Sequence, residues 1–335
     1  MSVNTLIQAT ALNRFYGEYH AVKDFNLTLN KGEVLGLLGP NGAGKSTTMQ
    51  MLTGNISPSS GEVIINGVNL LDEPQQAKRQ IGYLPEQPPI YRDMTVLEFL
   101  NYCASLHDIA KNNIKAAVAD AIERCSLQTV VNKLIASLSK GYQQRVGIAQ
   151  AILHRPEVVI LDEPTVGLDP IQITKIRDLI RELGKDHSVI LSTHILPEVQ
   201  AVCDRVQIIN QGETVFSDSF SELAQKQASN LLVVGFEHVI NEADLRKATG
   251  IKQIKALTNN RFQLEFDEKS DASSIYKLAI EQGWVLTELS PQDETLEQIF
   301  MNLVYTDTVT KNIDKNLDKN LDKGIISQST RERAS

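Results

Sequence analysis

The stretch "EVLGLLGPNGAGKST" at residues 33–47 decides the fold. It begins with a short apolar run of the kind that forms a buried strand, and a helical pattern follows it up to Gly54. Glycines between the two let the backbone wrap closely around phosphate groups. The loop matches the pattern G-x-x-x-x-G-K-[ST] at Gly39, Gly44, Lys45 and Ser46. The stretch therefore predicts a strand, a phosphate-binding loop and a helix, with Lys45 on the β- and γ-phosphates and Ser46 on Mg²⁺.

Strands and helices alternate on both sides of this loop. Short apolar runs predict further strands at residues 61–67, 80–87, 157–164 and 188–194. Two helical stretches, at about 95–107 and 111–125, interrupt this rhythm and indicate an inserted helical lobe. Strands that alternate with helices indicate an α/β fold with a right-handed, mainly parallel sheet.

Polar side chains follow several of these strands. Asp162 and Glu163 end the run "VVILDEP", where Asp162 can reach the magnesium shell and Glu163 can deprotonate a water that attacks the γ-phosphate. His194 ends the next strand, on the sheet edge where ligands bind in such folds. Gln87 ends the strand predicted at 80–87, and its amide can ligate magnesium or its water. We therefore expect Lys45, Gln87, Glu163 and His194 in catalysis and Ser46, Gln87 and Asp162 at the metal.

The sequence indicates a second anion-binding site far from the phosphate loop. In "LSKGYQQRVG" at 138–147, Ser139 stands where a helix begins and Gly141 leaves the backbone free. A helix N-terminus of this kind attracts an anion.

Taken together, these motifs resemble the nucleotide-binding subunit of ABC transporters, over about residues 4–225. The resemblance implies a P-loop ATPase domain with an antiparallel β subdomain, in which two subunits associate head to tail around two ATP molecules. Ser139 and Gly141 would then contact the γ-phosphate of ATP held by the other copy. It also implies that Tyr16 stacks on adenine and that the loop contacts ATP through Gly39, Asn41, Gly42, Gly44, Lys45, Ser46 and Thr47.

The signature "LSKGYQQR" departs from the commonest form "LSGGQ" at Lys140 and Tyr142. It is similar to the signature of exporters of the multidrug, lipid, polysaccharide and gliding-motility group.

The chain divides into three regions by sequence. Residues 1–225 form the expected ATPase domain, with the helical lobe at about 88–150. Residues 228–305 have the order β-α-β-β-α-β of a small ferredoxin-like α+β domain, closed by a helix at "DETLEQIFMNLV". Residues 306–335 carry the polar repeat "NIDKNLDKNLDKG" and are expected to be disordered.

Composition restricts the class of protein. The formal charge of −8 does not favour nucleic-acid binding, and the three scattered cysteines indicate neither disulfides nor a zinc site. No secretory signal and no run of about 18 apolar residues is found, so any membrane role needs a partner. We expect a peripheral protein on the cytoplasmic face of the inner or plasma membrane.

The sequence is best explained by the ATPase subunit of an ABC exporter, which binds ATP and Mg²⁺ and works with a separate membrane permease. The permease should dock on the lobe at "PPIYRDMTVLEFL" (88–100), with Tyr91 and Phe99 as candidate contacts, although the pattern predicts buried packing of Phe99 at least as strongly. An importer ATPase, a soluble ABC ATPase acting on DNA or ribosomes, and a regulatory ATP-binding protein are the alternatives.

Overall fold

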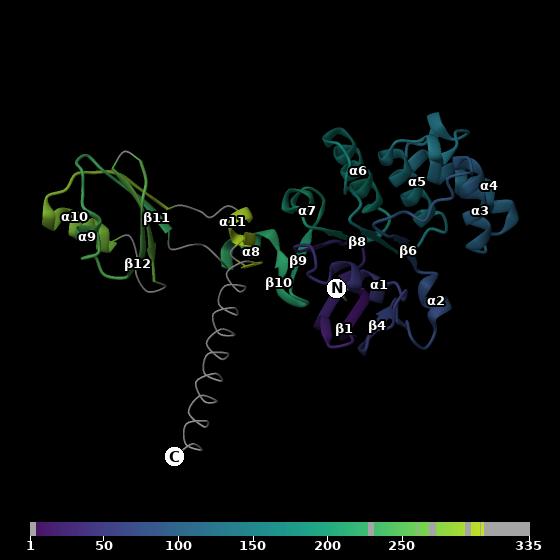
Figure 1. Ribbon diagram of the computed structural model, residues 1–335, viewed down its shortest axis with the longest axis horizontal. Coiled ribbons are helices and arrows are strands. Elements are labelled where there is room, and N and C mark those ends of the chain that lie inside the picture. Colours follow the sequence, from purple (N-terminus) through teal and green to yellow (C-terminus); the bar gives the residue numbers. More distant parts are fainter. Residues whose placement is uncertain are drawn as a thin grey trace, which may run out of the picture. The chain divides into compact units, whose positions relative to one another are not determined.

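The computed structural model describes residues 5–226, 231–258, 260–267, 273–291, 296–301 and 303–304 (Figure 1). The chain divides into two compact units, Met1–Phe220 and Ser221–Ser335. The tail expected at 306–335 lies outside the described residues.

A six-stranded sheet forms the centre of the first unit, and the expected mainly parallel α/β sheet is confirmed. The strands run in the order β10-β9-β3-β8-β7-β6, and all neighbours are parallel except the edge pair β9 and β10. Every residue of β3, β7 and β8 is buried, as expected for a parallel sheet covered on both faces. The bounds are β3 Val34–Leu38, β6 Ile81–Leu84, β7 Val158–Asp162, β8 Ser188–Thr193, β9 Arg205–Asn210 and β10 Glu213–Ser219.

Alternate residues of the central strands point to two different cores. Leu37 of β3 and Ile160 of β7 belong to the core that contains the phosphate-loop helix α1 (Lys45–Leu52) and the antiparallel sheet. Val159 of β7 and Val189 of β8 belong to the core on the opposite face, together with residues of the helical lobe and of α6. Figure 1 shows α6 and α7 on one side of the strands and α1 on the other. The central strands are therefore fixed from both sides, which makes their carboxyl ends a rigid edge for side chains.

The expected antiparallel β subdomain is a four-stranded sheet of order β2-β1-β4-β5. It is dominated by two 12-residue strands that pair through a hairpin closed by Tyr16 and Tyr19. Its strands are β1 Thr5–Tyr16, β2 Tyr19–Asn30, β4 Ser60–Ile65 and β5 Val68–Asn69.

The inserted lobe is helical, as expected. A capping box starts α3, in which the Thr95 hydroxyl accepts from the Glu98 N–H and the Glu98 carboxylate accepts from the Thr95 N–H. Of the two alternatives for Phe99, the structure shows the buried one, because the residue is 1% exposed and packs in the lobe's core, so it is not a permease contact. Tyr91 is 54% exposed. The helices and short 3₁₀ turns are α3 Val96–Leu106, α4 Lys111–Arg124, η1 Gln128–Val130, η2 Ile135–Ser137 and α5 Lys140–Ile152.

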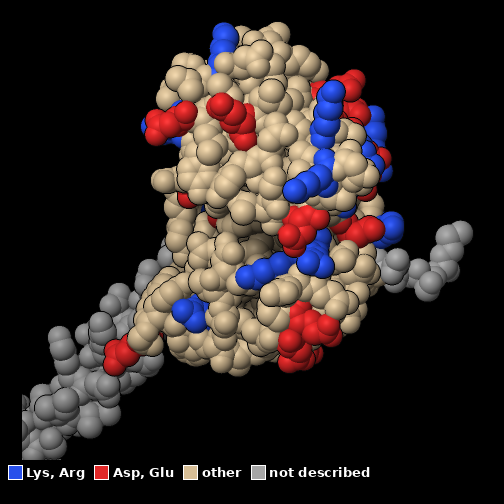
Figure 2. Space-filling model, turned by 90° about the vertical axis from the view of Figure 1, so that its right-hand side faces the viewer, with Lys and Arg blue, Asp and Glu red and all other residues tan. Residues whose placement is uncertain are grey.

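Figure 2 shows the face on the side of α3, α4 and α2, where lysine and arginine side chains are interspersed with aspartate and glutamate. The remaining helices of the first unit are α2 Pro74–Lys78, α6 Pro170–Leu183 and α7 Leu196–Val202, and α8 Phe220–Lys226 begins at the boundary between the two units. No described helix is both long and apolar enough to cross a bilayer.

The second unit contains the expected β-α-β-β-α-β order. Its sheet runs β12-β13-β11-β14 with all neighbours antiparallel, so the first and third strands of the unit lie in the centre. Its core includes Val234, Leu264 and Ile275. The elements are β11 Leu231–Phe236, α9 Glu242–Leu245, β12 Ile251–Ala256, β13 Arg261–Phe266, α10 Ser273–Gln282, β14 Leu286–Pro291 and α11 Leu296–Met301.

Candidate functional site

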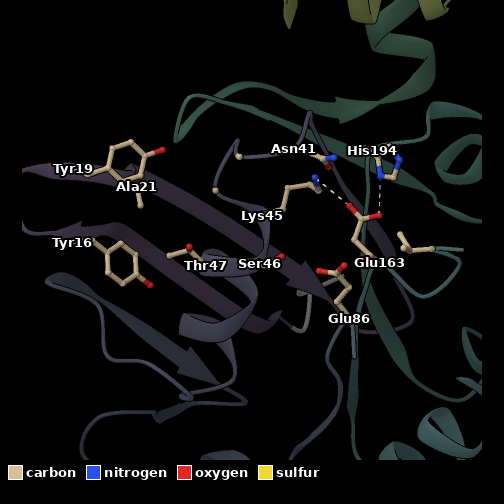
Figure 3. A pocket seen from close by; sticks show the side chains of 13 residues that line it. Tyr16, Tyr19, Ala21, Asn41, Lys45, Ser46, Thr47, Glu86, Glu163 and His194 are labelled. Atoms are coloured by element: carbon tan, nitrogen blue, oxygen red, sulfur yellow. Dashed lines mark hydrogen bonds and ion pairs between the residues drawn. The ribbon is translucent and has the colours of Figure 1, made fainter. Parts of the chain in front are cut away.

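A pocket of about 460 Å³ lies where β3, β7 and β8 end (Figure 3). Two tyrosines stand at one end of the pocket, and Lys45, Glu163 and His194 stand at the other. It brings together nine of the residues predicted from the sequence: Tyr16, Asn41, Gly42, Gly44, Lys45, Ser46, Thr47, Glu163 and His194.

The phosphate loop needs glycine at defined positions. Gly44 is the N-cap of α1 with a left-handed φ of 106°, and an added Cβ would stand 2.8 Å from the Ala21 carbonyl oxygen. At Gly39 an added Cβ would run into the backbone carbonyl of Ile209. The loop is also fastened by Lys45, whose Nζ donates to the carbonyl oxygen of Gly39 at 2.9 Å. The chain can therefore place backbone N–H groups and a cation around an anion at the start of α1.

Two oxygen-bearing side chains meet beside the loop and fit a magnesium ion. The Ser46 hydroxyl donates to Asp162 Oδ1 at 3.3 Å, and the Ser192 hydroxyl donates to the same oxygen. Burial raises the pKa of Asp162, the hydrogen bonds from Ser192 and Ser46 oppose this, and the nearby Glu163 and Glu86 raise it further. A hydroxyl and a carboxylate are the hard oxygen ligands that Mg²⁺ prefers.

Glu163 stands between a cation and an imidazole. Its Oε1 lies 3.2 Å from Lys45 Nζ, and its Oε2 lies 3.0 Å from His194 Nδ1 (Figure 3). Glu163 as a whole is 6% exposed. Its backbone has a φ of 48°, and its N–H donates to the Ser192 hydroxyl at 2.9 Å. A non-glycine residue held in the left-handed region is uncommon and often marks a functional site.

Some predicted residues lie outside the pocket. Gln87 is exposed and does not line it, whereas its neighbour Glu86 does. Asp162 lies behind the lining, where it reaches Ser46. Glu86 and Tyr19 line the pocket but were not predicted, although both stand beside a predicted residue: Glu86 next to Gln87, and Tyr19 across the hairpin from Tyr16.

The residues predicted to form a second anion-binding site lie at the N-terminus of α5. Ser139 is its N-cap, is exposed, and its hydroxyl forms no capping hydrogen bond. Gly141 is packed so closely on Gln172 that an added Cβ would stand 2.7 Å from the amide oxygen. The Lys140 ammonium lies against Gly167. Neither Ser139 nor Gly141 lines the pocket that contains Lys45.

Comparisons with known proteins point to one family. The profile of a family described as "ABC transporter" matches residues 22–166. The chain is 34% identical to the ABC transporter ATP-binding protein YxlF of Bacillus subtilis, over 90% of this chain and 100% of that protein. It is 33% identical to the bacitracin transport ATP-binding protein BcrA of Bacillus licheniformis, over 92% and 100%. A linearmycin resistance ATP-binding protein, LnrL of Bacillus subtilis, is 31% identical over 89% and 98%.

Solved structures agree on the first unit. The chain is similar to an ATP-binding subunit of an ABC transporter, with a TM-score of 0.60 and 31% identity, over 66% of this chain and 92% of that one. It is also similar to a dimeric bacterial ABC transporter cassette, with a TM-score of 0.59 and 26% identity, over 64% and 98%.

Proposed function

This chain belongs to the ABC transporter ATP-binding proteins, and we propose that it hydrolyses ATP with Mg²⁺ to power an exporter. The observation that carries the proposal is the arrangement of Lys45, Glu163 and His194 at the phosphate end of one pocket. The three side chains supply a cation, a carboxylate base and an imidazole at the carboxyl edge of a parallel sheet.

The binding step follows from the shape of the pocket. The purine lies at the tyrosine end, with Tyr16 stacked on its face. The phosphates lie in the loop around Gly42 and Gly44 and at the N-terminus of α1. Magnesium would be held by Ser46 and Asp162, and Gln87 would supply a further ligand for the ion or its water. The ion would neutralise charge on the phosphate oxygens.

In the hydrolytic step Glu163 serves as the base and His194 as the electrophilic partner. Lys45 leaves Glu163 for the β- and γ-phosphates, which frees one carboxylate oxygen to accept a proton from the attacking water. His194 keeps its contact with the other oxygen of Glu163 and faces the γ-phosphate. Because Glu163 is buried, its charge interacts more strongly with neighbouring charges than it would in water.

We propose that a second copy of the chain completes each site. The α5 N-terminus of one copy would place the Ser139 hydroxyl and the Gly141 backbone on the γ-phosphate held by the other copy. Two observations support this: the hydroxyl of Ser139 is exposed without a capping bond, and Ser139 lies outside its own chain's nucleotide pocket. A solved relative of the first unit is itself a dimer.

Export through a separate permease is the proposed use of this energy. The relatives named for bacitracin transport and linearmycin resistance support it, because resistance is consistent with removal of a compound from the cell. The permease would dock on the helical lobe near the exposed Tyr91. Such docking would hold the chain at the cytoplasmic face of the membrane.

The test is Glu163→Gln in the full-length chain, with ATP binding and steady-state turnover measured side by side. We expect binding to persist, turnover to fall by about 100-fold or more, and an ATP-bound dimer to accumulate on size-exclusion chromatography. Turnover within a few-fold of wild type would reject Glu163 as the base.

A further inference from the structure

We infer that Glu198 is a positioning residue that holds Glu163 and His194 in register, an inference that rests on the proposed function. Glu198 lies in α7, shortly after His194, and is 1% exposed. It does not line the nucleotide pocket and cannot touch the reacting atoms.

Glu198 ties together the two segments that carry the hydrolytic pair. The Thr165 hydroxyl donates to Glu198 Oε2 at 2.7 Å, and Thr165 stands two residues after Glu163. The Thr193 hydroxyl donates to the same oxygen at 2.8 Å, and Thr193 directly precedes His194. One carboxylate oxygen therefore bridges the loop that follows β7 and the end of β8.

The hydrogen bonds of the Thr193 hydroxyl fix the backbone on both sides of His194. The Thr193 Oγ1 that donates to Glu198 also accepts from the N–H of Ile195, at 3.1 Å. The backbone on either side of the histidine is thus fixed by one hydroxyl. On the other side of the pair, Ser192 bonds the Glu163 N–H through its hydroxyl and its carbonyl oxygen, at 2.9 and 3.2 Å. Glu198 and Ser192 together hold the two strand ends at two points.

Stability alone does not account for a carboxylate at this place. Among the described residues Glu198 forms no ion pair, and its Oε1 has no hydrogen-bond partner. A buried carboxylate without a cation is destabilising, and an apolar side chain of similar volume would often be more stable. What the carboxylate provides is a short bridge between two loops, and one of them holds Glu163 at a φ of 48° that its surroundings must impose.

Loss of the bridge should therefore affect chemistry more than binding. The phosphate loop and α1 do not contact Glu198 through any hydrogen bond, so ATP affinity should persist. A shift of about 1 Å in a catalytic group can lower the rate by up to about 100-fold.

The experiment compares three variants of the full-length chain in ATP turnover. Glu198→Leu keeps the volume and removes the acceptor, and we expect kcat to fall about 10- to 100-fold with the KM for ATP within about 3-fold of wild type. Glu198→Gln keeps an acceptor oxygen for both threonines, and we expect it to restore kcat to within about 3-fold of wild type. Ser188→Ala is the matched control, because it removes a buried hydroxyl that bonds the Gly32 N–H at the opposite end of β8.

The outcomes separate this inference from the proposed function. Wild-type kcat in Glu198→Leu, with Glu163→Gln inactive, overturns the inference and leaves the function standing. Turnover in Glu163→Gln within a few-fold of wild type rejects Glu163 as the base, and with it the premise of this inference. A Glu198→Gln variant as slow as Glu198→Leu also overturns the inference, since the bridge needs only an acceptor. If Glu198→Leu does not fold, Thr165→Val and Thr193→Val each remove one donor, and normal kcat in both overturns the bridge.

Discussion

The ion pair between Lys45 and Glu163 offers a test that needs no nucleotide. Both side chains are nearly buried, at 5% and 7% side-chain exposure, and their charged atoms lie 3.2 Å apart. Replacement of Lys45 by methionine leaves the carboxylate buried and without a cation. Such a loss costs about 3–5 kcal/mol when no other partner remains. Here the contact to His194 at 3.0 Å remains, so we expect Lys45→Met to lower the free energy of unfolding by about 2–3 kcal/mol.

The reverse substitution should cost less. In Glu163→Gln the Lys45 ammonium keeps its hydrogen bonds to the carbonyl oxygens of Gly39 and Pro40, at 2.9 and 3.2 Å. We expect a loss of about 1 kcal/mol. The double variant has no buried unpaired charge, so it should lose about 2 kcal/mol rather than the sum, which gives a coupling of roughly 1–2 kcal/mol. ATP binding should stay weak in the double variant, because Lys45 is absent.

The assay is urea unfolding of the wild type, both single variants and the double variant, followed by far-ultraviolet circular dichroism. Trp284 is the single tryptophan and packs against the core of the second unit, so its fluorescence reports that unit separately. A coupling below about 0.5 kcal/mol would refute the reasoning, because neighbours in one buried pair must be non-additive.

Two further expectations concern other parts of the chain. Burial and the stacked His107 lower the pKa of His154 from 6.5 to about 4. Because the unfolded state then binds more protons between these values, the free energy of unfolding should fall as the pH drops from 6.5 to 4, by at most about 3 kcal/mol. Urea midpoints at pH 6.5 and 4.5 should differ less in His154→Leu than in the wild type, and an unchanged difference would contradict the assignment. Truncation after about residue 225 should leave a protein that stays in solution and binds ATP, with altered dimerisation or permease-coupled turnover, and loss of nucleotide binding would show that residues 228–305 belong to the ATPase core.

The parts of the fold that the sequence predicts are those with an uninterrupted local pattern. The runs at β3, β7 and β8 are apolar throughout because both faces of these strands are covered. The sequence does not locate β1 and β2 as strands, and the antiparallel sheet is expected only through the family resemblance. The reason is that register shifts interrupt their pairing, with Ala11 at a φ of 49°, so the alternation of period two is broken.

The candidate site likewise contains residues that the sequence predicts and residues that it does not. Lys45, Glu163 and His194 are predictable because each follows a recognisable strand, and parallel strands end at one edge. Glu198 is not predictable, because its partners are far away in sequence or on another element and meet only when β7 and β8 lie side by side. The sequence leaves Phe99 open between surface and core because its ring can face either way on a helix, and only the packing of α3 in the lobe decides that it is buried.

The most direct test of the central claim mixes two inactive chains. Lys45→Ala removes the phosphate-loop cation, and Ser139→Arg blocks the seat at the start of α5. In a head-to-tail dimer the mixed pair has one site with both lesions and one site with neither. If the two sites work independently, equal mixing should restore about one quarter of wild-type ATP turnover, since about half of the dimers are mixed. Turnover no higher than that of the two separate variants, or a Ser139→Arg chain that hydrolyses ATP at the wild-type rate, would contradict the account.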